Sequence, residues 1–214
     1  MKTILFDIGI PFGILIGIGL WWRFAARQRS LPCPPWLGWS LENGYMNAVA
    51  SSATILDRLE IAPGMRVLDI GCGPGRITIP AAERVGLNGE VVALDIQQGM
   101  LDQVAKRVRE RPNLTNVRLI RAGAGEGQLE HHAFDRAWLV TVLGEIPNRE
   151  AALQEVYESL KPNGVLSITE VIPDPHYQSQ NTVRRLAEGV GFRFDHLYGN
   201  WLAFTMNFVR PTNP

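Results

Sequence analysis

The sequence predicts an α/β protein built on a doubly wound, mostly parallel sheet. Apolar stretches of strand length alternate with amphipathic stretches of helix length, the pattern that pairs strands in parallel through helical crossovers. Residues 65–70 are mostly apolar, as expected of a strand that is covered on both faces. Three glycines follow this strand at alternate positions, where the chain has to turn sharply. Together these features are typical of a sheet that binds a nucleotide-like ligand at its edge.

The expected elements follow in chain order. Ahead of the first strand, apolar residues at helical spacing predict an amphipathic helix over residues 41–60. Strands are expected at residues 65–70, 90–94, 117–121, 134–141, 165–170, 192–198 and 201–209. Helices are expected between them at residues 77–85, 97–109, 149–160 and 183–189. Residues 87–89 and 162–164 carry the glycine, proline and asparagine that mark turns.

The spacing of the glycines separates two classes of ligand. A dinucleotide fingerprint needs G-x-G-x-x-G, and its third glycine position is occupied here by Arg76. The chain instead reads Asp-x-Gly-x-Gly-x-Gly over residues 69–75, and a second acidic residue, Asp95, closes the next strand. This pair of features resembles the class I S-adenosylmethionine-dependent methyltransferases. The resemblance runs from about residue 61 to 210, or about seven tenths of the chain.

The resemblance implies a Rossmann-like methyltransferase fold of seven strands, with the last strand antiparallel, and S-adenosyl-L-methionine as the cofactor. Asp69 would orient the methionine amino group and Asp95 would accept bonds from the ribose hydroxyls, although a carboxylate at position 95 could instead cap the next helix. Ile96 and Met100 would sandwich the adenine. The residues expected to bind the cofactor are Asp69, Gly71, Gly73, Gly75, Asp95, Ile96, Met100, Gly123, Ala124 and Thr141.

One position departs from the family. After the third strand the family usually places an acidic residue that reads the adenine amino group, whereas this chain has Gly123 there. Two alternatives remain for the adenine edge: the backbone at Gly123 and Ala124, or the carboxylate of Glu126.

The acceptor is expected beyond the ends of the fourth and fifth strands. Methyl transfer from a sulfonium needs an aligned nucleophile, and it needs a base only when the acceptor must lose a proton. Glu145, His176, Tyr177 and Tyr45 are the candidate catalytic residues, and Thr141 and Glu170 could also touch the acceptor. Glu145 could instead cap the following helix, and His176 could be a solvated turn residue. Neither of the two cysteines has metal-ligand neighbours, so no metal site is expected.

The N-terminus predicts a single-pass membrane anchor. Asp7 is the only charged residue between residues 3 and 22, a run of nearly bilayer-spanning length. The run ends with Trp21-Trp22, and three arginines follow by residue 29, which places the catalytic domain on the cytoplasmic side. A cleaved signal peptide, a buried helix and an interfacial helix are the alternatives. The expected organisation is an anchor at residues 1–29, a juxtamembrane segment and cover helix at 30–60, and a methyltransferase domain at 61–214.

The charge balance limits the partners. The chain has 21 basic and 21 acidic side chains, so no overall positive field draws it to nucleic acid. An anchor would bring the site to the lipid bilayer, which favours a small lipophilic acceptor such as a phospholipid amine, a quinone or another isoprenoid, or a hydrophobic thiol. The alternatives are a membrane-tethered scaffold or sensor that binds S-adenosylmethionine without turnover, and an NAD-dependent oxidoreductase, which Arg76 disfavours.

Overall fold

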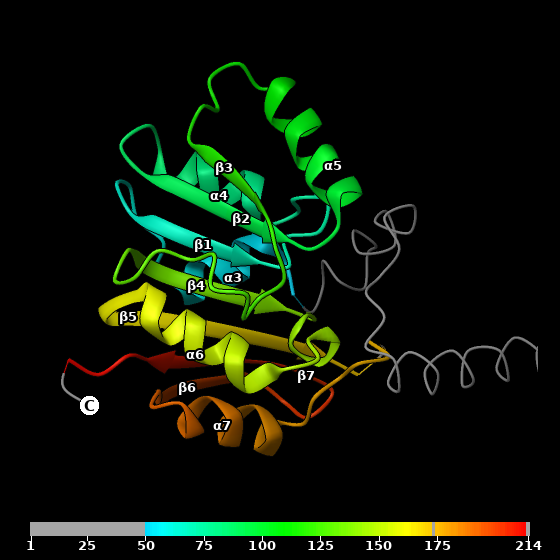
Figure 1. Cartoon of the computed structure of the whole chain (residues 1–214), viewed down its shortest axis with the longest axis vertical. Helices are drawn as coiled ribbons and strands as arrows, with labels where there is room; N and C mark the ends of the chain where they lie inside the picture. The colour runs from blue at the N-terminus through cyan, green and yellow to red at the C-terminus, as the bar shows by residue number, and fades with distance from the viewer. Residues whose placement is uncertain (1–49, 173, 213–214) are drawn as a thin grey trace, which may run out of the picture.

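The computed structural model describes residues 50–172 and 174–212, which form a single seven-stranded sheet with helices on both faces (Figure 1). The strands are β1 (Arg66–Ile70), β2 (Glu90–Asp95), β3 (Val117–Arg121), β4 (Phe134–Val140), β5 (Leu160–Val171), β6 (Arg193–Gly199) and β7 (Ala203–Val209). The helices are α3 (Ser52–Arg58), α4 (Thr78–Val85), α5 (Gln98–Arg109), α6 (Arg149–Ser159) and α7 (Gln180–Gly189), with a 3-10 turn η2 (Leu143–Glu145).

The strand order confirms a doubly wound sheet, and the strand directions make it a mixed one. The strands lie in the order β3-β2-β1-β4-β5-β7-β6. The pairs among β3, β2, β1, β4 and β5 are parallel, and β7 runs antiparallel to both β5 and β6. The winding direction reverses between β1 and β4, so the carboxyl ends of these two strands mark the place where such sheets bind ligands.

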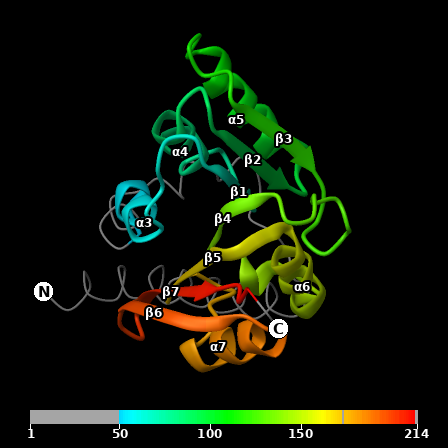
Figure 2. The same ribbon diagram turned by 90° about the vertical axis from the view of Figure 1, so that its left-hand side faces the viewer.

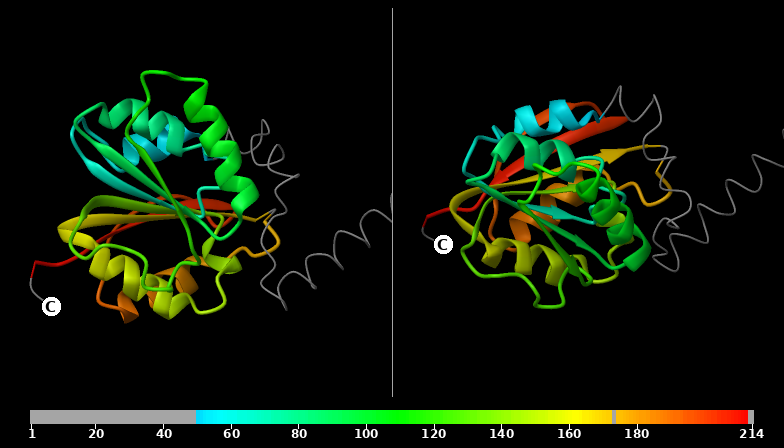
Figure 3. Two further views of the ribbon diagram at one scale, coloured as in Figure 1. Left: turned by 45° about the horizontal axis from the view of Figure 1, so that its top comes forward. Right: turned by 90° about the horizontal axis from the view of Figure 1, so that it is seen from above.

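The core forms two layers, one on each face of the sheet. In β1, Val67 packs with residues of α3 and α4, while Leu68 packs with residues of α6 and α7. Figure 2 and both views of Figure 3 show α6 and α7 on the face away from α3 and α4. Buried residues on both sides explain why the central strands are almost continuously apolar.

Helix α3 is held to the sheet by polar contacts as well as by apolar packing. The guanidinium of Arg58 donates to Thr205 Oγ1 at 2.9 Å, and Asn207 Nδ2 donates to the Arg58 carbonyl at 2.8 Å. The Thr205 hydroxyl also bonds that of Thr169 at 2.9 Å, so one polar row on β5 and β7 fixes the helix position.

The prediction of one continuous helix over residues 41–60 is wrong, because α3 begins only at Ser52 and Ser51 caps it. Ser51 is extended, with φ −63° and ψ 146°, and its hydroxyl accepts a bond from Thr54 N at 3.1 Å. A serine that caps a helix in this way starts a new helix and interrupts any that precedes it. The part of the prediction before residue 50 lies outside the described residues, as do the anchor at 1–29, its boundary with the juxtamembrane segment, and Tyr45. Within the described residues, no helix is both long and apolar enough to cross a bilayer.

Two further elements differ from their expected bounds. Strand β5 begins at Leu160, directly after α6, although regular pairing with β4 resumes only at Val165. Asn163 lies between them with φ +62°, so the expected turn at 162–164 is an irregularity within the strand. Helix α7 begins earlier than expected, at Gln180, because the Ser179 hydroxyl caps it by accepting from Thr182 N.

Candidate active site

The glycine loop after β1 is pinned to the end of β2. Gly71 N and Cys72 N both donate to the Leu94 carbonyl, at 2.8 and 3.1 Å. Gly71 has φ +65°, and a Cβ at this position would fall 2.6 Å from both methyl carbons of Val142. Backbone conformation and space therefore both exclude a side chain from the first turn of the loop.

Asp95 joins this loop to the start of α5. Its side chain is 6% exposed; Gly73 N donates to Oδ2 at 2.9 Å, and Gln97 N donates to Oδ1 at 2.8 Å. Burial raises the pKa of the carboxyl, while these two backbone bonds oppose the rise. Asp95 is thus more than a helix cap, because it also fixes the loop. Each of its oxygens keeps a second lone pair, which suits a ligand with paired hydroxyls.

Asp69 is buried directly behind the loop. Its Oδ2 accepts a bond of 2.7 Å from the hydroxyl of Thr78, a partner on α4 that the sequence did not indicate. Burial raises the pKa of Asp69 to about 7, although the Thr78 bond lowers it. The loop therefore stands between two buried carboxyl groups, Asp69 at the end of β1 and Asp95 at the end of β2.

Arg76, in the position of the missing third glycine, reaches across the loop. Its guanidinium donates to the carbonyl of Ala50 at 2.6 Å. Ala50 is fully buried and lies just before α3. The arginine therefore ties the segment that enters α3 to the glycine loop.

The residues expected around adenine lie at the ends of β2 and β3. Ala122 N donates to the Asp95 carbonyl at 3.2 Å, which brings Gly123 and Ala124 next to Asp95. Ile96 is 55% exposed at this edge, whereas Met100 is 2% exposed. Ile96 is thus open to a ligand, and Met100 belongs to the packed interior at the start of α5.

The loops after β4 and β5 meet backbone to backbone. Thr141 leaves β4 with φ +57°, and its N donates to the Thr169 carbonyl at 2.8 Å. Beyond it, Gly144 in η2 packs so closely that a Cβ would overlap the carbonyl of His176. Glu145 ends η2 and is half-buried, and the cap of α6 is Asn148, which accepts from Ala151 N. Capping of that helix therefore does not account for Glu145.

The loop after β5 holds two of the candidate acceptor residues, His176 and Tyr177. His176 is 4% exposed, so it is not a solvated turn residue, and its N donates to Asp174 Oδ1 at 2.6 Å. Tyr177 donates its hydroxyl to the Trp201 carbonyl at 2.7 Å, which links this loop to the turn between β6 and β7. His176, Tyr177 and Glu145 are thereby brought to one edge of the sheet.

Glu170, at the end of β5, is the most buried titratable group of this loop cluster. Gln178 N donates to its Oε2 at 3.0 Å, and Oε1 has no hydrogen-bond partner among the described residues. Burial raises the pKa of Glu170 to about 8, so the group is mostly protonated at neutral pH. The sequence analysis suggests Glu170 as a residue that could touch the acceptor, but it does not predict that Glu170 is buried or that Gln178 N donates to its carboxyl group.

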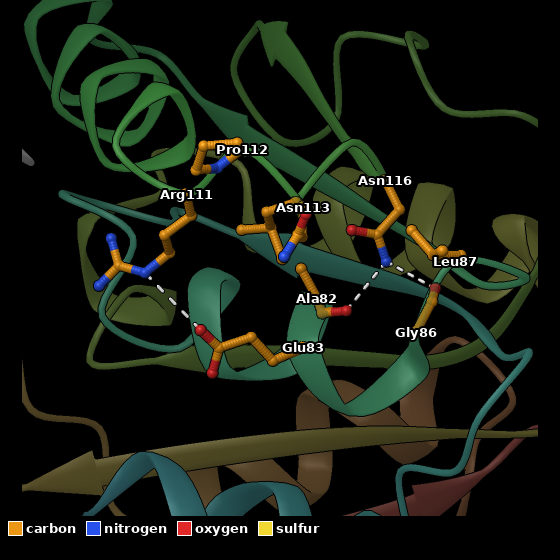
Figure 4. A pocket seen from close by; sticks show the side chains of 9 residues that line it. Ala82, Glu83, Gly86, Leu87, Arg111, Pro112, Asn113 and Asn116 are labelled. Atoms are coloured by element: carbon orange, nitrogen blue, oxygen red, sulfur yellow. Dashed lines mark hydrogen bonds and ion pairs between the residues drawn. The ribbon is translucent and has the colours of Figure 1, made fainter.

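A separate hollow of about 460 Å³ lies at the opposite edge of the sheet, between the end of α4 and the turn before β3 (Figure 4). Asn116 closes one side by donating from Nδ2 to the carbonyls of Ala82 and Gly86, at 2.9 and 2.7 Å. Because it lies at the amino ends of β2 and β3, this hollow is not part of the site. Across residues 50–172 and 174–212, no group of three or more His, Cys, Asp or Glu is placed to hold a metal ion.

Comparison with known proteins shows what this region is similar to. Residues 67–164 match a protein-family model described as a methyltransferase domain. These residues, a little under half of the chain, are therefore similar to a methyltransferase domain. The match begins in β1 and ends within β5, so it includes the glycine loop, Asp95 and the loop after β4.

Several curated relatives are named for quinone methylation. The ubiquinone/menaquinone biosynthesis C-methyltransferase of Idiomarina loihiensis is 35% identical over 115 residues, 54% of this chain and 46% of the relative. A demethylmenaquinone methyltransferase of Geobacillus sp. is 32% identical over 151 residues, 71% of this chain and 58% of the relative. The chain thus spans about half the length of the curated relatives that it matches.

Solved structures share the fold. A SAM-dependent methyltransferase from Aquifex aeolicus superposes with a TM-score of 0.75 at 21% identity, over 83% of this chain and 99% of that chain. A Haemonchus contortus phosphoethanolamine N-methyltransferase, solved with S-adenosyl-L-methionine, superposes with a TM-score of 0.64 at 17% identity, over 75% of this chain and 52% of that chain. The predicted methyltransferase fold and S-adenosylmethionine cofactor are confirmed.

Proposed function

We propose that this protein transfers the methyl group of S-adenosylmethionine to a small lipophilic acceptor at a membrane surface, with a quinone-type ring as the best-supported acceptor. The cofactor would lie along the carboxyl edge of the sheet, with its methionine part at Asp69 and the glycine loop and its ribose at Asp95. The charges support this assignment, because the buried carboxyl of Asp69 suits an ammonium group.

An exposed apolar turn beside the loop after β5 is the observation that carries the acceptor class. Trp201 is 66% exposed and Leu202 is 42% exposed, both on the turn between β6 and β7. Ala203, the first residue of β7, pairs with Val171 at the carboxyl end of β5, so the turn lies at the same edge as the site. Large apolar side chains left in solvent at the rim of a site favour a lipophilic partner.

The names of several relatives favour a quinone as the acceptor. Transfer to a ring carbon forms a carbon–carbon bond, breaks the sulfur–methyl bond and leaves S-adenosylhomocysteine, and the ring carbon then has to lose a proton. Glu145, His176 and Glu170 are titratable groups near the carboxyl ends of β4 and β5, as are Asp174 and Tyr177. We assign the acceptance of this proton to Glu145 or His176, because Glu170 is mostly protonated at neutral pH, with Tyr177 and Thr141 beside them.

The sequence supports the proposed location at a bilayer. Residues 8–22 lack charged side chains, and Trp21-Trp22 followed by arginines is typical of a cytoplasmic boundary. A single-pass anchor there would place the domain on the cytoplasmic side, where its cofactor is made available. The zero net charge of the chain likewise supports a small acceptor over a nucleic acid.

Labelled cofactor tests the proposal. The full chain is incubated with methyl-labelled S-adenosylmethionine and either a membrane extract or reduced demethylmenaquinone in mixed micelles. We expect the label in the organic phase, and label found only in protein or water-soluble metabolites would contradict the lipophilic acceptor.

A double variant tests the apolar turn. Trp201→Ser with Leu202→Ser keeps the Trp201 carbonyl that Tyr177 bonds, and should raise the KM for the lipophilic acceptor about 10-fold while affinity for S-adenosylhomocysteine stays the same. Leu87→Ser is the matched control, because Leu87 is 75% exposed at the opposite edge of the sheet. An equal effect of both changes would argue against a specific role for the turn.

A further inference from the structure

The indole of Trp138 lies beside the buried carboxyl of Asp69. Strand β1 pairs in parallel with β4, and Asp69 is the register partner of Trp138. Register partners point to the same face of a sheet, on strands about 5 Å apart. Trp138 is fully buried in the core layer formed with α3 and α4, and α4 also carries the Thr78 hydroxyl that bonds Asp69. The indole and the carboxyl therefore share one buried compartment.

The indole N–H of Trp138 makes no well-formed hydrogen bond to any of the described residues. Its Nε1 is buried, and a buried donor without an acceptor is costly. Ser167 flanks Trp138 on the other side, in β5, but its Oγ is also buried and without a partner within residues 50–172 and 174–212. The indole therefore does not bond Ser167, and Asp69 is the acceptor on its opposite side.

Asp69 already responds to this N–H. Burial raises the pKa of Asp69 to about 7, and hydrogen bonding from Thr78 and from the indole of Trp138 opposes the rise. The indole thus acts on the carboxyl, although the two groups fall outside the geometry of a full hydrogen bond. Only a small movement separates them from one.

Ionisation of Asp69 strengthens the case for that bond. A carboxylate accepts about four hydrogen bonds, whereas a neutral carboxyl uses one oxygen to carry its own proton. A hydrogen bond to a charged acceptor is about twice as strong as one between neutral groups. The Thr78 hydroxyl meets only part of this capacity, and the indole N–H supplies a further donor from the buried face of the sheet.

The charged groups around Asp69 act from the loop side. Arg76 lowers the pKa of Asp69 through its charge, whereas the charge of Asp95 raises it. The thiol of Cys72 stays neutral, because burial and then the Asp69 and Asp95 carboxylates raise its pKa. All three belong to the glycine loop or the end of β2, so the indole is the group that approaches from β4.

We propose that Trp138 is a positioning residue for Asp69: its indole N–H completes a hydrogen bond to the carboxylate when Asp69 releases its proton to solvent, and so orients the carboxylate toward the methionine ammonium of the cofactor. This role rests on the proposed placement of the methionine part at Asp69. The bond itself can be measured without the cofactor, so its failure is distinguishable from failure of that placement.

Nuclear magnetic resonance of the cofactor-free full chain tests the bond. The indole N–H signal of Trp138 is assigned by its disappearance in Trp138→Phe. As the pH rises through about 7 this signal should move downfield, because its acceptor gains charge, and in Asp69→Asn it should not titrate. A signal that does not titrate in wild type, or that titrates equally in Asp69→Asn, would overturn the proposal.

The pH dependence of S-adenosylhomocysteine binding tests the role in the site. Trp138→Phe should shift the binding profile to higher pH and weaken affinity at about pH 6 about 10- to 100-fold, because the carboxylate loses a donor. Benzothienylalanine at position 138 keeps the double ring without an N–H, so it should give the same shift even if the phenylalanine variant fails to fold. Ser167→Ala, on the other side of Trp138, is the matched control and should bind as wild type.

Two outcomes of the binding experiment would contradict the proposal. A pure packing role for Trp138 would weaken binding equally at every pH, with no shift of the profile, and that result would overturn it. Wild-type affinity in Asp69→Asn would refute the placement of the methionine part, and with it this role of Trp138, whatever the indole titration shows.

Discussion

The raised pKa of Asp69 predicts that cofactor binding depends on pH. The usual pKa of this side chain is 3.8, and burial raises it to about 7 in the cofactor-free protein. If the carboxylate holds the methionine ammonium, binding requires Asp69 to be ionised. Affinity for S-adenosylhomocysteine should therefore rise as the pH increases toward about 7 and level off above it.

The size of this pH dependence follows from the proton that Asp69 must lose before the cofactor binds. Below the raised pKa each pH unit should weaken binding about tenfold, or about 1.4 kcal/mol, because a growing fraction of Asp69 is protonated. At about pH 6, close to one proton should be released per cofactor bound, and at about pH 8 almost none from this group. The α-amino group of the ligand itself titrates near pH 8, so the useful window lies below about pH 7.

Calorimetry in buffers of different ionisation enthalpy measures both the affinity and the proton count. Asp69→Asn should bind more weakly at neutral pH and lose most of the pH slope. Asp102→Asn, on the exposed face of α5, is the matched control and should behave as wild type. The same slope in Asp69→Asn as in wild type, or proton uptake on binding, would refute the reasoning.

Three other predictions concern the fold and the site. Gly71→Ala should abolish binding of S-adenosylhomocysteine, because the new Cβ meets Val142 at 2.6 Å, and adding Val142→Ala should restore it only in part since φ stays at +65°. Glu170 keeps its proton only in the folded state between about pH 4.5 and about pH 8, so the free energy of unfolding should fall as the pH rises through this range, by up to about 1.4 kcal/mol per pH unit. Urea unfolding of Glu170→Gln should lack that pH-dependent component. Thr205→Val should lower the free energy of unfolding by about 1–3 kcal/mol, because the Arg58 guanidinium loses an acceptor, whereas Thr115→Val on an exposed loop should change it little.

The arrangement of the glycine loop between two carboxyl groups could be predicted from sequence because its determinants are local. A strand, a glycine loop and an acidic residue at the end of the next strand lie within about thirty residues, and backbone geometry fixes their relation. Thr78 was missed because a threonine early in a helix does not show which buried carboxyl it faces. The break at Ser51 was missed because apolar periodicity does not detect a serine that has become a cap.

The acceptor half depends on contacts between distant segments. The burial of Glu170 and His176 arises where the loop after β5 folds against η2, more than twenty residues earlier in the chain. Residue type alone could not show whether His176 is solvated or buried. The sequence could name these side chains, but their surroundings come from tertiary packing.

The contact between Gly144 and His176 has a consequence for how this enzyme could change its acceptor. Because the two backbones touch with no side chain between them, the segments after β4 and β5 can shift only as one body. Enlarging position 144 would displace the histidine and, with it, the tyrosine beside it. New acceptor preferences should therefore arise by paired exchanges in both segments, or at the outer turn carrying Trp201, where single substitutions meet no such constraint.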